Sequence, residues 1–362
     1  MSDPGTEFTS VKAPQPQRVI LGPWTGVARF GDFQGEYTAA TTGLALNDRD
    51  YRGLLCATGA DRLTWLSNLV TNQIKTLEPG QGAYAFALNA QGRILFDLNI
   101  LVRPDELWLD VDRRWIPDAL NHLNKYLITE DVTLVDRTAD FVRLGLTGSG
   151  LREALPRLSG GDVGCGLLRA AKCDIAGCPT SFVRSDFGGA LGIELFVPAD
   201  RARRVFDTLV DGFGAAPVGF DVVDTLRIEH AIPWPISEIN DDVLPAETGQ
   251  FSRAVSHTKG CYLGQEIVER MRSRNVVARR LTLLRISGDL VPPANATLAV
   301  DGIDVGRVTS ARLSPKNKAP VALAYVRAEH ATPGESLTSR WDSQVQECTV
   351  LDPPEPREPA TS

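Results

Sequence analysis

The sequence contains few of the residues, and none of the short motifs, on which the commonest enzyme chemistries depend. Only four histidines occur in 362 residues, and no pair has the H-E-x-x-H spacing of zinc hydrolases. A G-x-S-x-G turn, which presents the serine nucleophile of many hydrolases, is also missing. Neither a phosphate loop G-x-x-x-x-G-K-S/T nor a G-x-G-x-x-G between a strand and a helix is present. Zinc hydrolysis, serine hydrolysis and nucleotide-driven chemistry are therefore not expected.

Cysteine is sparse and irregularly spaced. The six cysteines lie at positions 56, 165, 173, 178, 261 and 348. A disulfide framework needs a denser arrangement in a shorter chain, so we expect reduced thiols. Cys165, Cys173 and Cys178 form a loose cluster, but their spacing matches none of the usual zinc patterns. No metal site is predicted.

Long apolar runs are absent as well. No stretch approaches the roughly 18 residues that a membrane span needs. The first ten residues, MSDPGTEFTS, lack the basic region and apolar core of a signal peptide. We therefore expect a cytoplasmic protein that does not bind membranes. The formal net charge of −7 argues against a general nucleic-acid binder, because phosphate binding requires a basic excess.

One segment departs from this acidic average. Between Arg253 and Arg280 there are seven Lys or Arg against two acids, Glu266 and Glu269, a local net charge of +5. Such a cluster attracts anions, or it forms the solvated face of a helix, and the sequence leaves both readings open.

Hydrophobic patterning divides the chain into four parts. Residues 1–17 and 353–362 are rich in polar residues or proline and are expected to be disordered. Strands and helices alternate unevenly over 18–280, which predicts an α+β region, and short alternating strands over 281–352 predict a small β-barrel. The pattern predicts strands at Gly82–Leu88, Arg93–Val102, 281–286, 297–300, 304–311, 321–325 and 345–351, and helices near 115–126, 199–212 and 219–230.

The segment Lys259–Glu266, KGCYLGQE, places a thiol between two glycines ahead of a predicted helix. The free N–H groups of that helix's first turn, together with Lys259, would favour the thiolate of Cys261. The alternative is an inert buried cysteine, which is common in proteins. His257, four residues earlier, could serve as the base for Cys261, although a surface histidine in a loop is the commoner case.

Asp97 interrupts an otherwise apolar strand, Ile94-Leu95-Phe96-Asp97-Leu98. An unpaired carboxylate is costly to bury, so we expect a pocket or a buried partner to hold it.

Several segments together resemble the YgfZ family, folate-binding proteins of iron–sulfur cluster maintenance, which is related to the glycine-cleavage T-protein, an aminomethyltransferase. KGCYLGQE is similar to the signature of that family and is the most specific element. The other segments resemble the superfamily at large, and the resemblance covers about residues 25–350. These segments are 61–74 (DRLTWLSNLVTNQI), 92–100 (GRILFDLNI), 188–197 (GGALGIELFV) and 225–231 (TLRIEHA).

The resemblance implies a T-protein-like fold of two interleaved α+β subdomains followed by a C-terminal β-barrel, with tetrahydrofolate or a one-carbon derivative as cofactor. It implies that Glu229 reads the pterin, and that Glu194 lies near the cofactor. A carboxylate suits the pterin edge, because it can accept two N–H bonds. The alternatives without a role in binding are a solvent-facing helix acid for Glu229 and a structural ion pair for Glu194 or Arg184.

By the same resemblance, Asp97 matches the aspartate that helps transfer the one-carbon unit in the T-protein, although here it could serve only as a folate ligand. Arg184 precedes the turn that leads to Glu194. Tyr84 and Trp24 are candidate stacking faces for the pterin or aryl ring, with core packing as the commoner role.

Two functions follow from these residues. The first is a tetrahydrofolate-binding protein that supports iron–sulfur cluster assembly or repair, with Cys261 as the functional thiol and iron–sulfur client or assembly proteins as partners. The second is a folate-dependent aminomethyl- or methyltransferase that uses Asp97, with Cys261 merely structural. The sequence does not decide whether turnover occurs, and a scaffold with a vestigial folate pocket is a third alternative.

Overall fold

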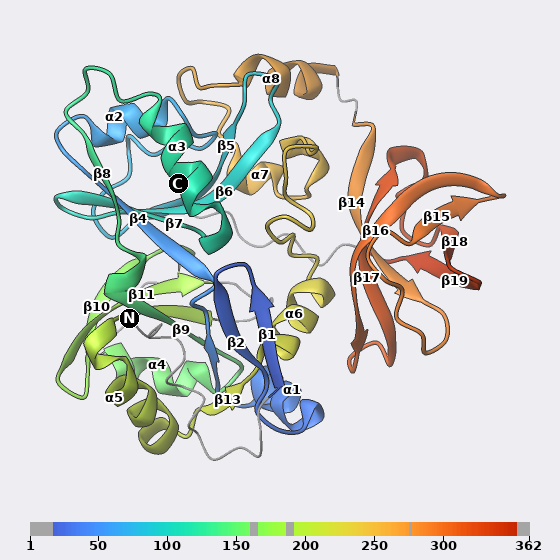
Figure 1. Cartoon of the computed structure of the whole chain (residues 1–362), viewed down its shortest axis with the longest axis horizontal. Helices are drawn as coiled ribbons and strands as arrows, with labels where there is room; N and C mark the ends of the chain where they lie inside the picture. The colour runs from blue at the N-terminus through green and yellow to red at the C-terminus, as the bar shows by residue number, and fades with distance from the viewer. Residues whose placement is uncertain (1–16, 160–165, 186–191, 275–276, 353–362) are drawn as a thin grey trace.

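The computed structural model describes residues 17–159, 166–185, 192–274 and 277–352. Within them the chain forms two antiparallel-rich sheets, a two-stranded ribbon and a closed barrel (Figure 1). Of the expected tail 1–17, residues 1–16 lie outside the described residues, whereas Gln17 begins β1 (Gln17–Leu21). The expected tail 353–362, Cys165 and residues 188–191 of the resemblance also lie outside them. No helix in the described ranges is long and apolar enough to cross a membrane.

The first sheet has five strands in the order β5-β6-β7-β4-β8. Its central strands are buried on both faces, and Phe86, Phe96 and Leu55 pack in its core. β5 and β6 confirm the two predicted strands, and the turn between them contains Gly92 at φ +73°, a left-handed conformation that suits glycine. The elements of this layer are β4 (Arg52–Thr58), α2 (Arg62–Ser67), β5 (Gly82–Leu88), β6 (Ile94–Val102), β7 (Glu106–Asp112), α3 (Ile116–Asn124) and β8 (Thr133–Asp136).

The second sheet has six strands in the order β10-β11-β12-β9-β3-β13, with only β13 and β3 parallel. Helices α4 and α5 pack on it through Leu151, Val205 and Phe206. Its elements are α1 (Phe33–Thr42), β3 (Ala45–Asp48), β9 (Phe141–Thr147), α4 (Leu151–Ser159), β10 (Ala170–Ile175), β11 (Cys178–Ser185), β12 (Gly192–Pro198), α5 (Ala202–Asp207) and β13 (Ala216–Val218). The chain leaves this sheet after β3, builds the whole first sheet, and returns at β9, so the two α+β units are interleaved as expected.

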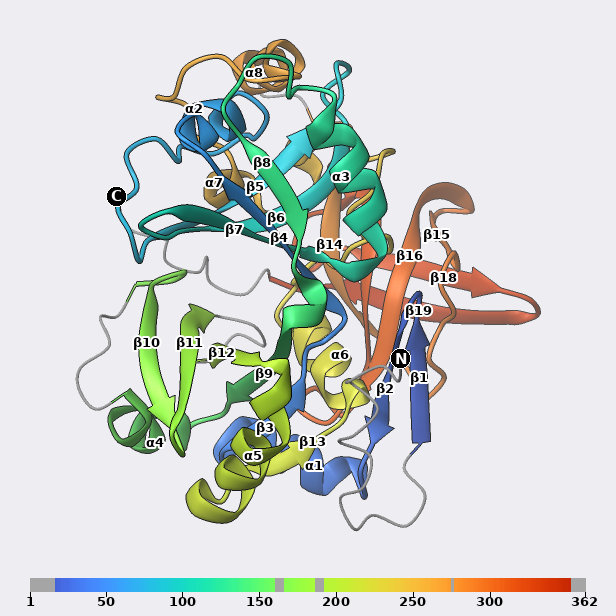
Figure 2. The same cartoon turned by 60° about the vertical axis from the view of Figure 1, so that its left-hand side comes forward.

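The barrel closes in the order β14-β17-β16-β15-β18-β19 and lies to one side of both sheets (Figures 1 and 2). Closure leaves no free strand edge, which removes a common route to aggregation. The patterning predicted five of these strands and missed β18. The barrel strands are β14 (Arg279–Ile286), β15 (Thr297–Val300), β16 (Ile303–Ser314), β17 (Ala319–Arg327), β18 (Ser336–Trp341) and β19 (Gln344–Val350).

Helix α6 (Phe220–Glu229) joins these parts. Every residue of α6 except Asp221 is buried, because the helix packs against β2 (Trp24–Arg29) on one side and against β16 of the barrel on another. The remaining elements are β1 (Gln17–Leu21), β2 (Trp24–Arg29), α7 (Phe251–Ala254), α8 (Gln265–Arg274), a short π-helix at Thr208–Gly212 and short 3-10 helices at Arg113–Trp115, Thr138–Asp140, Ala199–Arg201, Pro245–Glu247 and Ala328–His330.

Candidate functional site

A cavity of about 870 Å³, counted to its open mouth, lies between the two sheets and the segment that follows α6. Side chains from both sheets, from α6 and from the loop 232–235 line it. The lining includes Arg49, Arg52, Tyr84, Asp97, Asn99, Asp110, Arg143, Val183, Arg184, Glu194, Arg227, Trp234 and Arg253.

Asp97 lies at this cavity, on β6, with a buried partner on the neighbouring strand. The side chain is 6% exposed, and the Tyr84 hydroxyl donates a 2.9 Å hydrogen bond to its Oδ2. Among the described residues, nothing bonds to its Oδ1. Burial raises the pKa of Asp97, against the opposing pull of the Arg52 charge and the Tyr84 hydrogen bond. The carboxyl therefore has one hydrogen-bonded oxygen and one unpaired oxygen, and it is easier to protonate than an ordinary aspartate.

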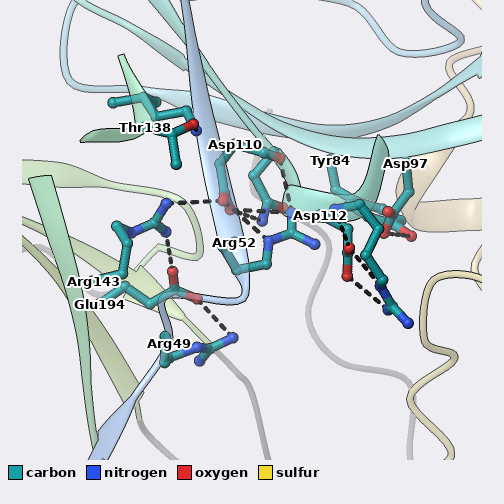
Figure 3. A network of polar contacts seen from close by, with 12 residues as sticks. Arg49, Arg52, Tyr84, Asp97, Asp110, Asp112, Thr138, Arg143 and Glu194 are labelled. Atoms are coloured by element: carbon teal, nitrogen blue, oxygen red, sulfur yellow. Dashed lines mark hydrogen bonds and ion pairs between the residues drawn. The ribbon is translucent and has the colours of Figure 1, made fainter. Parts of the chain in front are cut away.

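Beside Asp97, a chain of buried ion pairs joins the two sheets (Figure 3). Arg52 Nε lies 3.0 Å and Arg143 Nη1 lies 2.9 Å from Oδ1 of Asp110. Burial alone would raise the pKa of Asp110, but these two guanidinium groups hold it well below its usual range. Asp110 is thus the fixed negative centre of the site.

Glu194 continues the same chain. Arg143 Nη2 donates to its Oε2, and Arg49 Nη2 lies 3.1 Å from its Oε1. Both carboxylate oxygens are therefore engaged within the protein although Glu194 lines the cavity. This geometry is that of a structural ion pair, which was one of the alternatives that the sequence left open for Glu194.

Arg184 lies on β11 and also lines the cavity. Its Nε, the adjacent Ser185 Oγ and the Asn99 Oδ1 are buried polar atoms without a hydrogen-bond partner in the described ranges. Such atoms are costly to bury unsatisfied, so a cavity that contains several of them suits a polar ligand.

Glu229 is not among the residues that line this cavity, and its role in reading the pterin stays a prediction from the resemblance. It is buried against α1 and the barrel, where the hydroxyls of Tyr37 and Ser314 donate to its two oxygens. Arg227, two residues earlier on α6, lines the cavity instead. Residues two apart on a helix point to different sides, and because α6 is buried on nearly every side, its sequence carries no amphipathic signal to separate them.

Aromatic side chains contribute one wall. Trp234 lines the cavity between two prolines, and Arg227 Cζ lies 5.3 Å from its ring centroid. Trp24 is 1% exposed and packs with Tyr51 and Phe220 behind this wall, so it offers no free stacking face. Sequence reasoning missed Trp234, for which the surrounding Ile-Pro-Trp-Pro run was the available signal.

Cys261 is exposed and is not among the residues that line the cavity. It precedes α8, which begins at Gln265. Lys259 does not face the thiol as expected: it is buried, and its Nζ donates to the backbone carbonyls of Ser67 and Val70. Burial lowers the pKa of Lys259 to about 8.

Gly264 of the same motif has a structural requirement. Its φ is +81°, and a Cβ there would lie 2.6 Å from the carbonyl oxygen of Asn89 in the turn between β5 and β6. The motif is therefore packed onto the turn that leads into the strand of Asp97. His257 lies with its Nδ1 3.6 Å from Glu269 Oε1.

Comparisons with known proteins agree with this architecture. Residues 17–259 match the family described as GCVT N-terminal domain, and residues 279–355 match the glycine cleavage T-protein C-terminal barrel domain. The solved structure of the glycine cleavage system aminomethyltransferase T from Bartonella henselae superposes with a TM-score of 0.85 at 19% identity, over 96% of each chain.

Sequence relatives extend over nearly the whole chain. An aminomethyltransferase of Synechococcus sp. (strain CC9311) is 27% identical over 93% of this chain and 94% of its own length. An aminomethyltransferase of Halalkalibacterium halodurans is 28% identical over 88% of each chain. The domain matches, the interleaved sheets and the terminal barrel together show that the chain belongs to the glycine-cleavage T-protein family.

Proposed function

We propose that the chain binds tetrahydrofolate, or a one-carbon derivative of it, in the central cavity and acts there as a folate-dependent aminomethyl- or methyltransferase. The observation that carries this proposal is the unpaired Oδ1 of Asp97, a buried carboxyl oxygen of a cavity-lining residue that has no hydrogen-bond partner among the described residues. The family membership and the aminomethyltransferase relatives support the same reaction class.

The cavity residues fit this cofactor. Its pterin is flat and carries N–H donors along one edge, and its glutamate tail is anionic. The acceptors without a partner among the described residues include Asp97 Oδ1 and Asn99 Oδ1, and the donors include Arg184 Nε and Arg143 Nε. Trp234, Phe196 and Val183 supply apolar or aromatic surface between them. Acceptors for the ring edge, a cation for the tail and flat walls are the groups that such a ligand needs.

When bound, tetrahydrofolate supplies the nitrogen atoms that carry the one-carbon unit. Asp97 would hold or release a proton at Oδ1, which its raised pKa places closer to neutral pH. Tyr84 fixes the other oxygen, so that the carboxyl keeps one orientation. Arg52 and Asp110 form a buried ion pair beside it, and this pairing holds both charges in fixed positions.

Equilibrium titration with tetrahydrofolate tests the binding. The wild type should bind, and Arg184→Gln should bind about tenfold more weakly because a charge-assisted contact to the anionic tail is lost. Glu229→Gln is the control: it lies outside the cavity and should change the dissociation constant less than about twofold. No binding to the wild type would reject the cofactor, and a large loss only in Glu229→Gln would restore the reading from the resemblance.

A second candidate function is the support of iron–sulfur cluster assembly or repair, on the same folate-binding framework. What favours it is the exposure of Cys261, in contrast to Cys56, Cys173, Cys178 and Cys348, which are buried. An accessible thiol can exchange with a partner, whereas a buried thiol cannot. The KGCYLGQE motif is the only sequence feature that points to this branch.

Cys261→Ser separates the two candidates in cells. Under the iron–sulfur function, a deletion strain carrying Cys261→Ser should have iron–sulfur enzyme activities as low as the deletion itself, while tetrahydrofolate binding is unchanged because the thiol is outside the cavity. Asp97→Asn is the matched comparison, since it alters the cavity and leaves the thiol intact. Wild-type activities in the Cys261→Ser strain, when the deletion lowers them, would exclude the thiol mechanism.

A further inference from the structure

Strand β16 presents three hydroxyl or guanidinium groups on one face. Ser310, Arg312 and Ser314 alternate along the strand, and side chains two apart in a strand share a face. Each donates to a different acid near α6. Ser310 Oγ lies 2.7 Å from Glu238 Oε1, Arg312 Nε lies 2.7 Å from Asp224 Oδ2, and Ser314 donates to Glu229.

Two of these acids hold Arg227 with their other oxygen. Glu238 Oε2 accepts from Arg227 Nη1 at 2.7 Å, and Asp224 Oδ1 accepts from Arg227 Nε at 2.7 Å. Glu238 Oε2 also accepts the backbone N–H of Trp234 at 2.8 Å. Arg227 and Trp234 are the two members of this network that line the cavity.

We infer that Ser310 and Arg312 of the barrel are positioning residues, which hold Arg227 and Trp234 in the cavity wall by fixing the carboxylates of Glu238 and Asp224. A carboxylate bonded at both oxygens has one orientation, whereas one bonded at a single oxygen can rotate. Because Glu238 is fully buried and Asp224 and Arg227 are 7% and 3% exposed, water cannot readily replace a lost partner. The barrel thereby sets the affinity of a site that it does not itself line.

Ser314 provides an internal control on the same face of the strand. Its acid, Glu229, bonds to Tyr37 and does not contact Arg227 through any hydrogen bond or ion pair described here. If the strand only docked the barrel onto α6, loss of either hydroxyl would affect stability alone. If Ser310 positions Arg227 and Trp234, loss of its hydroxyl must also change the affinity of the cavity for its ligand.

The first experiment rests on the proposed function and measures tetrahydrofolate affinity in the full chain. Ser310→Ala should weaken binding about fivefold, the equivalent of about 1 kcal/mol for one hydrogen bond. Ser310→Thr retains the hydroxyl and should restore affinity, and Ser314→Ala should stay within about twofold of the wild type. Thermal unfolding of each variant identifies any that fails to fold. Equal affinities for Ser310→Ala and Ser314→Ala, when the wild type binds, would overturn the inference.

The second experiment needs no ligand. Amide hydrogen exchange in the free protein should be at least about threefold faster over residues 227–239 in Ser310→Ala, because the Trp234 N–H shares the Glu238 carboxylate. Ser314→Ala should leave that segment unchanged. Faster exchange in Ser310→Ala with no folate binding by the wild type would reject the cofactor and keep the positioning role. Unchanged exchange in Ser310→Ala would reject the positioning role whatever the wild type binds.

Discussion

Replacing Asp97 by asparagine should lower the rate of one-carbon transfer at least about 100-fold, the usual contribution of a positioned general acid or base. Asparagine keeps the size of the side chain and can still accept the Tyr84 hydrogen bond, but it cannot hold and release a proton at Oδ1. Tetrahydrofolate affinity should fall as well, because the amide NH2 takes the place of the Oδ1 acceptor, so the transfer rates are compared at saturating tetrahydrofolate. The measurement is single-turnover transfer to or from tetrahydrofolate, with affinity from a parallel titration.

Tyr84→Phe is the matched control for this prediction. The hydroxyl of Tyr84 lowers the pKa of Asp97, so its removal should raise that pKa and move the pH profile of the transfer to higher pH. Asp97→Asn should have no such profile left. A transfer rate in Asp97→Asn within about threefold of the wild type would show that another group moves the proton.

Asp97→Asn should also increase the free energy of unfolding at pH 7. A carboxyl whose pKa is raised on folding stabilises the folded state only below its ordinary pKa of 3.8, and this contribution is lost as the pH rises through the folded pKa. At pH 7 the wild type therefore bears the cost of a buried carboxylate, and Asp97→Asn does not. The advantage of Asp97→Asn should therefore shrink as the pH falls through the raised pKa of Asp97, and it should be gone below the ordinary value of 3.8. Denaturant unfolding at pH 7 and pH 4 measures the difference.

Replacing Asp110 by asparagine should lower the free energy of unfolding by about 3–5 kcal/mol, the usual cost of breaking a buried ion pair from one side. Asp110 is 2% exposed and is the shared partner of Arg52 and Arg143, so its neutralisation leaves two buried guanidinium groups short of one negative charge. Urea unfolding followed by circular dichroism measures this loss.

The pH dependence of that loss has a definite sign. Because the folded pKa of Asp110 is depressed, its stabilisation is fully present above the ordinary carboxyl pKa and is lost only as the pH falls through the depressed value. The difference between the wild type and Asp110→Asn should therefore stay constant from pH 8 to about 5 and narrow in acid.

Asp200→Asn is the matched control for Asp110→Asn, since the Asp200–Arg201 pair has side chains 73% and 53% exposed. Water screens such a pair, so its loss should cost less than about 0.5 kcal/mol. If Asp110→Asn lowered the free energy of unfolding by as little as this, solvent would have to reach the ion pairs between the two sheets.

Much of the local architecture could be predicted because its causes are local. The apolar runs of β5 and β6, the glycine turn between them and the helix of α6 follow from hydrophobic pattern and backbone preference. Asp97 could be singled out for a related reason, since a charge inside an apolar strand demands a pocket or a partner. Strand β18 was missed because its sequence, SLTSRW, has little apolar alternation and is held by its neighbours in the barrel.

The partners within the site could not be predicted in the same way. Arg52 and Asp110 are 58 residues apart, and Arg143 and Glu194 are 51 apart, yet they form one buried chain across two sheets. Lys259 stands beside Cys261 in the sequence, but burial turns its ammonium group to the carbonyls at the end of α2. Proximity along the chain was a poor guide in both cases, because long polar side chains bond wherever folding brings an unsatisfied group.

By itself, the sequence determined the class of this protein. It carries the interleaved α+β pattern, the barrel at its end, the buried carboxyl of Asp97 and the resemblance to the T-protein superfamily. Only the tertiary structure decided that Arg227 lines the cavity and Glu229 does not, that Glu194 is engaged by two arginines, and that Ser310 of β16 bonds to Glu238. The physical reason is that a pattern reports which side chains must be buried, whereas their hydrogen-bond partners depend on which segments folding places against them.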